Sequence, residues 1–181
     1  MGQTEARPRL GIYPGSFDPV TVAHLHVAEV AVETCGLDRL ELSISVATLG
    51  KDDLALSPVA ERLGHLQALA ANRPWLGVRS STASLLADVA EGFDVLVVGA
   101  DKWHQLLDVT WYGSAEVRDA ALARLPVVAV APRAGWSLPG DDPAAAPPAG
   151  VEVIVLATDP VHHHVSATAV REGRHDWRAT S

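Results

Sequence analysis

The chain has 181 residues, of which 48% are hydrophobic and 20% charged, a composition that fits one globular domain with a sizeable core and excludes a disordered chain. The formal net charge of −8 at pH 7 argues against binding to nucleic acid or to an anionic membrane. A single cysteine, Cys35, excludes an intramolecular disulfide, and we expect it to be a small buried core residue. No apolar run has the length of a membrane span, and the first residues have no signal-peptide core, so we expect a cytoplasmic protein.

Apolar runs of strand length alternate with helix-periodic stretches along the chain. The predicted strands span residues 9–13, 39–46, 75–81, 94–100, 127–132 and 151–157, and the predicted helices span residues 21–35, 57–74, 81–92, 114–126 and 166–173. Strands that alternate with helices indicate a parallel sheet. The fold class predicted is therefore α/β: a single Rossmann-like domain over residues 1–181, with an open, mainly parallel sheet and helices on both faces.

Three segments fall outside this alternation of strands and helices. Residues 1–8 and 174–181 are predicted to be tails. The stretch from Leu138 to Gly150, LPGDDPAAAPPAG, is rich in proline and glycine and is predicted to be a flexible surface loop inside the domain, because a strand follows it.

The first strand-to-helix junction, PGSFDPVTVAH, is the first candidate site. Gly15 would let the backbone approach a ligand closely. Thr21 and His24 are three residues apart on the first helical turn, so they share a face at the positive end of a helix dipole, which suits an anion. The commonest phosphate-binding loops, GxGxxG and GxxxxGK[ST], are both missing here. The alternative is a simple turn glycine followed by a helix histidine.

A second candidate site lies near the other end of the chain, in VSATAVRE. Ser166 is well placed as the N-cap of the last helix, and Thr168 and Arg171 are three residues apart, so they can face together. Hydroxyl groups, helix N–H groups and a guanidinium could clamp a polyphosphate. The alternative is a capped surface helix with a solvated arginine.

Together, GSFDPVTVAH and VSATAVR resemble the signatures of the nucleotidylyltransferase superfamily, G-x-F-D-P-x-[HT]-x-G-H and I-S-x-T-x-x-R. The resemblance implies transfer of a nucleotidyl group from a nucleoside triphosphate to a phosphate acceptor, with release of pyrophosphate. It implies catalytic roles for His24, Thr21 and Arg171. It also implies that the phosphates are bound by Gly15, Ser16, Phe17, Ser166 and Thr168.

A third stretch bears on the acceptor. The sequence GADKW from Gly99 to Trp103, and VVAVAPRAGW further on, resemble the nicotinate- and nicotinamide-mononucleotide adenylyltransferases. This resemblance implies that Gly99 and Asp101 contact the adenosine end of the nucleotide. It further implies a phosphate contact for Lys51 and a tryptophan stacked on the pyridine ring, for which the candidates are Trp103 and Trp111. Packing in the core or at its rim is the alternative for either tryptophan.

The expected partners are small molecules: ATP and an acceptor that carries a phosphate. Mg²⁺ is expected as the cofactor, held mainly by the ATP phosphates rather than by protein ligands. The run His162–His164 invites a transition-metal interpretation, but consecutive side chains cannot all point at one ion, and contact with the triphosphate is the other reading. The oligomeric state stays open, a homo-oligomer included.

Two alternatives to a pyridine-nucleotide enzyme stay open. Phosphopantetheine adenylyltransferases commonly carry threonine at the first motif position, as Thr21 does here. A nucleotide-binding homologue without turnover is the second, because Thr21 replaces the first motif histidine and Ala23 replaces the glycine before His24.

Overall fold

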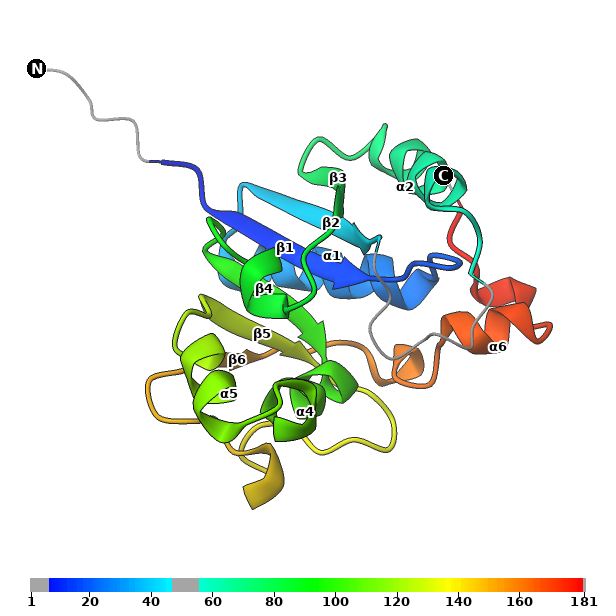
Figure 1. The fold of residues 1–181 in the computed structure, drawn as a ribbon. Helices are drawn as coiled ribbons and strands as arrows, with labels where there is room; N and C mark the ends of the chain where they lie inside the picture. Colours follow the sequence, from blue (N-terminus) through cyan, green and yellow to red (C-terminus); the bar gives the residue numbers. More distant parts are fainter. Residues whose placement is uncertain (1–6, 47–55, 181) are drawn as a thin grey trace, which may run out of the picture.

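The computed structural model describes residues 7–46 and 56–180, which form one sheet covered by helices (Figure 1). The strands are β1 (Leu10–Gly15), β2 (Arg39–Ser45), β3 (Leu76–Ser81), β4 (Val95–Gly99), β5 (Val127–Ala131) and β6 (Val153–Val155). The α-helices are α1 (Val22–Cys35), α2 (Val59–Ala70), α3 (Leu86–Val89), α4 (Ala100–Leu107), α5 (Ala115–Leu122) and α6 (Ala167–Arg171). Short 3₁₀ turns are η1 (Val109–Trp111), η2 (Pro143–Ala145), η3 (Pro160–His162) and η4 (His175–Trp177).

The six strands are all parallel and stand in the order β3-β2-β1-β4-β5-β6. The α/β class and the parallel sheet predicted from sequence are confirmed. The chain builds outward from β1 to β3 and then returns to β4, so the direction of winding reverses between β1 and β4. Ligands of open α/β sheets bind at such a reversal, beyond the carboxyl ends of the strands.

β1 pairs over a longer stretch with β2 than with β4. β1 pairs with β2 from Leu10 to Gly15, but it pairs with β4 only at Gly11 and Ile12. Beyond Ile12 the backbones of β1 and β4 separate, and this opens a crevice at the carboxyl edge of the sheet.

Each face of the sheet has its own apolar core. On one face, Leu42 and Val97 pack with α1 and α2; on the other, Leu96 and Val130 pack with α4 and α5. Figure 1 shows α4 and α5 side by side on one side of the strands. Cys35 is buried at the end of α1, and burial raises the pKa of its thiol, as expected for a core cysteine.

Two helices differ from the prediction. α3 is only four residues long, although residues 81–92 were predicted to be helical. α4 was not predicted, because its eight residues bury only Ala100, Trp103 and Leu106, too short a pattern for a clear helical period.

The segments predicted to be loop and tail are bound to the domain. Ala145, inside the 138–150 loop, is fully buried, and its carbonyl accepts a hydrogen bond from the Trp103 indole at 2.9 Å. Near the C-terminus, Arg178 forms a bridge with Thr21, and the Ala179 N–H donates to the Val20 carbonyl at 3.1 Å. Residues 174–180 therefore return to the start of α1 rather than extending away as a tail.

Replacing Trp103 should loosen the 138–150 loop and the core beneath it. Trp103→Phe removes the indole donor and leaves the buried Ala145 carbonyl without its partner, so we expect the free energy of unfolding to fall by about 1–3 kcal/mol. Urea denaturation measures the change. The control is Trp111→Phe, at a side chain that is 42% exposed, where we expect a change within about 0.5 kcal/mol. Equal effects of the two substitutions would contradict the anchoring role of Trp103.

Candidate active site

The turn after β1 is shaped by Gly15 and Phe17. Phe17 is buried and has a φ of +45°, in the left-handed region that non-glycine residues seldom adopt. A Cβ at Gly15 would lie 2.8 Å from Cζ of the Phe17 ring, so only glycine leaves room for it. The ring packs edge-on against the imidazole of His24, with 5.1 Å between centroids. The turn therefore orients the first predicted catalytic side chain.

Thr21 fixes the orientation and the tautomer of His24. Thr21 is the N-cap of α1, and its hydroxyl accepts from the His24 N–H while the His24 Nδ1 accepts from the Thr21 N–H at 3.0 Å. Because Nδ1 accepts a backbone proton, the neutral ring carries its own proton on Nε2. The predicted shared face of Thr21 and His24 is present. Thr21 is fully buried, so its contact with His24 is that of a positioning residue.

The second motif meets the first in space. Ser166 is the N-cap of α6, as predicted, and accepts from the Ala169 N–H at 3.1 Å. Arg171 donates from Nη1 to the Asp18 carbonyl and from Nη2 to the Thr168 hydroxyl. In Figure 1, α6 lies close to the turn that follows β1. The structure thus brings together two segments about 150 residues apart, and the Arg171 guanidinium retains further N–H donors for a ligand.

The turn is also tied to α2 by a buried arginine that was not predicted. Arg62 is only 4% exposed, and it donates from Nη1 to the Ser16 carbonyl at 2.8 Å and from Nε to the Ser57 carbonyl at 2.9 Å. Asp18, also buried, accepts from the Ser57 N–H at 2.8 Å. Pro58 is the N-cap of α2, and no side chain caps this helix.

A first pocket lies on the α1 side of the crevice, and we call it the histidine pocket. Three imidazoles and a guanidinium are among the groups that line it. The residues that line it are Tyr13, Ala23, His24, Val27, Gly99, Ala131, Pro132, Arg133, Thr158, His162, His163 and Val165. An anion that entered this pocket would meet several donors that can carry positive charge.

Asp101 and Arg133 form a pair beside the histidine pocket. Their Oδ1 and Nε atoms are 3.7 Å apart. Burial, with the Asp101 carboxylate second, holds the pKa of the Tyr13 phenol well above its usual range, so Tyr13 stays protonated at physiological pH. A Cβ at Gly99 would lie 2.7 Å from Oδ1 of Asp101, so the Asp101 carboxylate lies directly against Gly99. Arg133 was not singled out, although it stands in the quoted VVAVAPRAGW stretch, directly after a buried strand.

The histidine run contributes to the same pocket. The His163 Nε2 lies 3.1 Å from the Thr158 hydroxyl, and the ring of His162 packs against that of His26 with 4.5 Å between centroids. His164 is exposed. Within residues 7–46 and 56–180, no cluster of three or more histidine, cysteine or acidic residues has the arrangement of a metal site. Of the two readings of the run, its position favours contact with an anionic ligand.

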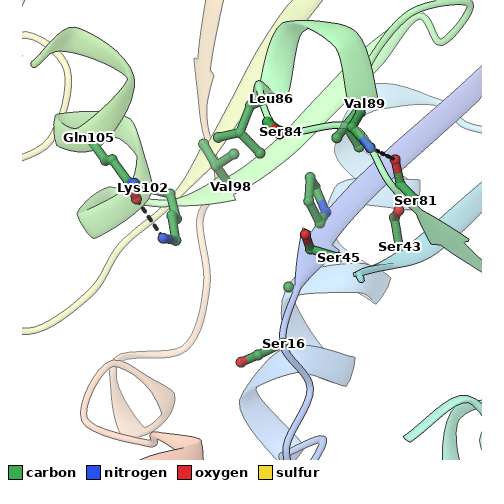
Figure 2. A pocket seen from close by; sticks show the side chains of 13 residues that line it. Ser16, Ser43, Ser45, Ser81, Ser84, Leu86, Val89, Val98, Lys102 and Gln105 are labelled. Carbon is green, nitrogen blue, oxygen red and sulfur yellow. Dashed lines mark hydrogen bonds between the residues drawn. The ribbon is translucent and has the colours of Figure 1, made fainter. Parts of the chain in front are cut away.

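A second pocket, which we call the serine pocket, lies across the crevice and encloses about 120 Å³. Its residues come from the ends of β1, β2 and β3, from α3 and from α4 (Figure 2). They are Pro14, Gly15, Ser16, Ser43, Ser45, Ser81, Ala83, Ser84, Leu86, Val89, Val98, Lys102 and Gln105. Pro14 of this pocket follows Tyr13 of the histidine pocket on β1, and Val98 precedes Gly99 on β4. The two pockets therefore lie at the same carboxyl end of these strands, on opposite faces of the sheet.

Ser43 stands out in this pocket. It is 1% exposed, and its hydroxyl has no hydrogen-bond partner among the described residues. Buried hydroxyls are normally paired. On β2, Glu41, Ser43 and Ser45 alternate with Leu40, Leu42 and Ile44, and β2 is an internal strand of the sheet. A polar face on an internal strand was the sequence signal for this pocket.

The remaining predicted residues are placed as follows. Gly99 lines the histidine pocket and Asp101 stands beside it. Trp103 is fully buried in the core, and Trp111 is 42% exposed on η1; both lie outside the lining of the two pockets. Packing in the core, the alternative that the sequence left open, describes Trp103. Lys51 lies outside the described residues.

The fold and the two pockets define an α/β protein with candidate ligand sites at the point where the sheet reverses. The chain belongs to the Cytidylyltransferase-like family, which matches residues 12–173. This confirms the predicted superfamily and, with it, the class of nucleotidyltransferases. None of the helices in the described part of the chain combines the length and the apolar character that crossing a bilayer requires.

Individual relatives agree with this assignment. A probable nicotinate-nucleotide adenylyltransferase of Dehalococcoides mccartyi is 24% identical over 91% of this chain and 84% of its own. One of Methylorubrum extorquens is 39% identical over 62 residues, which is about a third (34%) of each chain. A phosphopantetheine adenylyltransferase of Rhodopseudomonas palustris is 56% identical over 39 residues, 22% of each chain.

The fold is shared with a solved structure. It is Plasmodium falciparum nicotinic acid mononucleotide adenylyltransferase complexed with NaAD, which matches with a TM-score of 0.68 and 16% identity. The match covers 92% of this chain and 83% of that one. The predicted Rossmann-like architecture is confirmed over nearly the whole chain.

The unpaired Ser43 hydroxyl should cost stability when no ligand is bound. We expect Ser43→Ala to raise the free energy of unfolding by about 1 kcal/mol, because an unsatisfied buried hydroxyl is removed. Thermal or urea unfolding of the ligand-free protein tests this. Ser80→Ala, at an exposed position on β3, is the control. A loss of stability in Ser43→Ala would mean that the hydroxyl is paired in the free protein.

Proposed function

We propose that this protein is an adenylyltransferase that moves AMP from ATP to a pyridine mononucleotide, with nicotinate mononucleotide as the preferred acceptor, in NAD biosynthesis. The observation that carries the proposal is the presence of two pockets at the carboxyl ends of β1 and β4. Transfer between two phosphate compounds needs two sites that meet at the reacting atoms. Two relatives, one matched over 91% of this chain and one over 34%, are named probable nicotinate-nucleotide adenylyltransferases, and these names support the nicotinate form.

In this proposal the histidine pocket receives ATP. The Nε2–H of His24 points its proton toward a phosphate oxygen, and Arg171 and the helix N-terminus at Ser166 bind the β- and γ-phosphates. Arg133, His162 and His163 add donors along the same wall. Gly99 and Asp101 stand where the adenosine end would lie, and a carboxylate at a strand end can accept from a ribose hydroxyl.

The acceptor occupies the serine pocket with its phosphate toward Gly15 and Ser16, in the turn that leads to His24. An oxygen of that phosphate attacks the α-phosphorus of ATP. One P–O bond forms to the acceptor, and the bond to the bridging oxygen breaks and releases pyrophosphate. The attacking oxygen is already an anion, so the reaction needs no general base, and positioning and charge stabilisation account for the rate.

Mg²⁺ belongs to the same proposal. Mg²⁺ usually keeps several waters and is bound through substrate phosphates with one or two carboxylates, so we expect an ion that arrives on the triphosphate. Such an ion would neutralise part of the phosphate charge. The protein's own donors, His24, Arg133 and Arg171, would act on the oxygens that the ion leaves exposed.

The experiment that tests the proposal is an acceptor panel with ATP and Mg²⁺. Nicotinate mononucleotide, nicotinamide mononucleotide and phosphopantetheine are supplied in turn, and pyrophosphate and the coupled product are measured. We expect the nicotinate dinucleotide as the main product. Turnover with phosphopantetheine alone would favour the other branch, to which the short Rhodopseudomonas match points. ATP binding with no pyrophosphate from any acceptor would indicate a homologue without turnover.

His24 should be required for the rate more than for the fold. We expect His24→Ala to lower kcat by about 10²–10³, because one positioned donor to the developing charge is lost. His175→Ala, at an exposed histidine on η4, is the matched control and should keep full activity. Circular dichroism melts of both variants check folding. Activity within a few-fold of wild type in His24→Ala would exclude His24 from the proposed role.

A further inference from the structure

The serine pocket has two unlike walls. Leu86, Val89 and Val98 give it an apolar side, and the hydroxyl-bearing residues Ser43, Ser45 and Ser81 stand along the strand ends (Figure 2). A flat ring with a polar substituent matches this arrangement, because its face can pack on the aliphatic side chains while its edge meets hydroxyl groups.

Lys102 is the one charged side chain among the described residues that line this pocket. It is half-buried on the first turn of α4, and its Nζ donates to Oε1 of Gln105 at 2.5 Å. Figure 2 shows the two side chains at one end of the pocket. In the described part of the chain, Lys102 takes part in no ion pair.

The surroundings of Lys102 leave its charge poorly compensated. Burial lowers the pKa of the ammonium group, with a smaller opposing effect from Asp101 and a further lowering by Arg133. Asp101 faces Arg133, 3.7 Å away, rather than forming an ion pair with Lys102. A partly desolvated cation that has no ion-pair partner among the described residues is stabilised by an anion that enters the pocket.

We propose that Lys102 determines the acceptor specificity of the serine pocket, and that it selects a ring that carries a carboxylate over the same ring with a carboxamide. This inference rests on the proposed function, since it assumes that the acceptor's ring enters the serine pocket. It adds a named residue and a chemical criterion for the choice of acceptor.

The discrimination follows from donors and charges. An ammonium group has donors only, so it pairs well with a carboxylate, whereas the NH₂ of a carboxamide brings further donors and no charge. The Ser43 hydroxyl can donate or accept, so it can bond to either substituent and does not distinguish them. Among the described residues that line the pocket, Lys102 alone carries a charge that separates the acid from the amide.

The test is a specificity ratio. The kcat/KM for nicotinate mononucleotide is divided by that for nicotinamide mononucleotide, in wild type and in Lys102→Met, which keeps the aliphatic stem and removes the charge. We expect the ratio to fall about tenfold or more in Lys102→Met, the size expected for one charged hydrogen bond. Lys102→Arg should retain most of the preference. Arg39→Gln, which removes a positive charge at the opposite end of β2, should leave the ratio unchanged.

Calorimetric binding of the same two mononucleotides separates this inference from the proposed function, because it does not depend on turnover. A binding preference for the acid that disappears in Lys102→Met supports the role of Lys102 even if no pyrophosphate is released, an outcome that would reject only the proposed activity. A ratio that stays within twofold of wild type in Lys102→Met overturns the inference while leaving the activity in place. ATP binding with no binding of either mononucleotide overturns both.

Discussion

The anchoring of the turn between β1 and α1 is the constraint on which the candidate site depends. Two arginines from elements far apart in the chain donate to backbone carbonyls of this turn: Arg62 of α2 to Ser16, and Arg171 of α6 to Asp18. A backbone carbonyl can accept a hydrogen bond whatever side chain its residue carries. The two contacts therefore fix the conformation of the backbone in this turn. That conformation places Phe17 against His24 and Gly15 in the lining of the serine pocket.

The distribution of charge explains how an acidic chain can bind two anionic substrates. The net charge is −8, yet the crevice gathers cationic or ionisable donors: His24, Arg133, Arg171 and Lys102. Each has a local partner that orients it, namely Thr21, Asp101, Thr168 and Gln105. Substrate binding then depends on a few oriented donors in contact with the substrate. It depends less on the long-range electrostatic field of the net charge, which salt screens.

Much of the site could be predicted from local sequence. The strand-helix alternation placed Gly15, Thr21, His24 and Gly99 at the carboxyl edge of a parallel sheet, and Ser166 at the start of the last helix. These placements depend on patterns within about ten residues, which composition and spacing encode directly. Arg62, Ser43 and Lys102 escaped notice because each looks ordinary in its own segment: an arginine in a helix, a serine in an alternating strand, a lysine after a glycine turn. Trp103 was a candidate for stacking on the ligand because of the resemblance carried by GADKW, although it packs beneath the 138–150 loop.

The sequence by itself determined the order of the strands and helices along the chain and the class of the sheet, because periodicity and capping are local properties of the chain. It also contains the two motifs that contact phosphate in the proposed reaction. Only the tertiary structure decided which side chains share a pocket. The register of β1 against β2 and β4 aligns Pro14 with Ser43 while separating the strands beyond Ile12, and that separation sets Lys102 on one side of the crevice and Arg133 on the other. Register between distant segments follows from packing of the whole core, so no short stretch of sequence contains it.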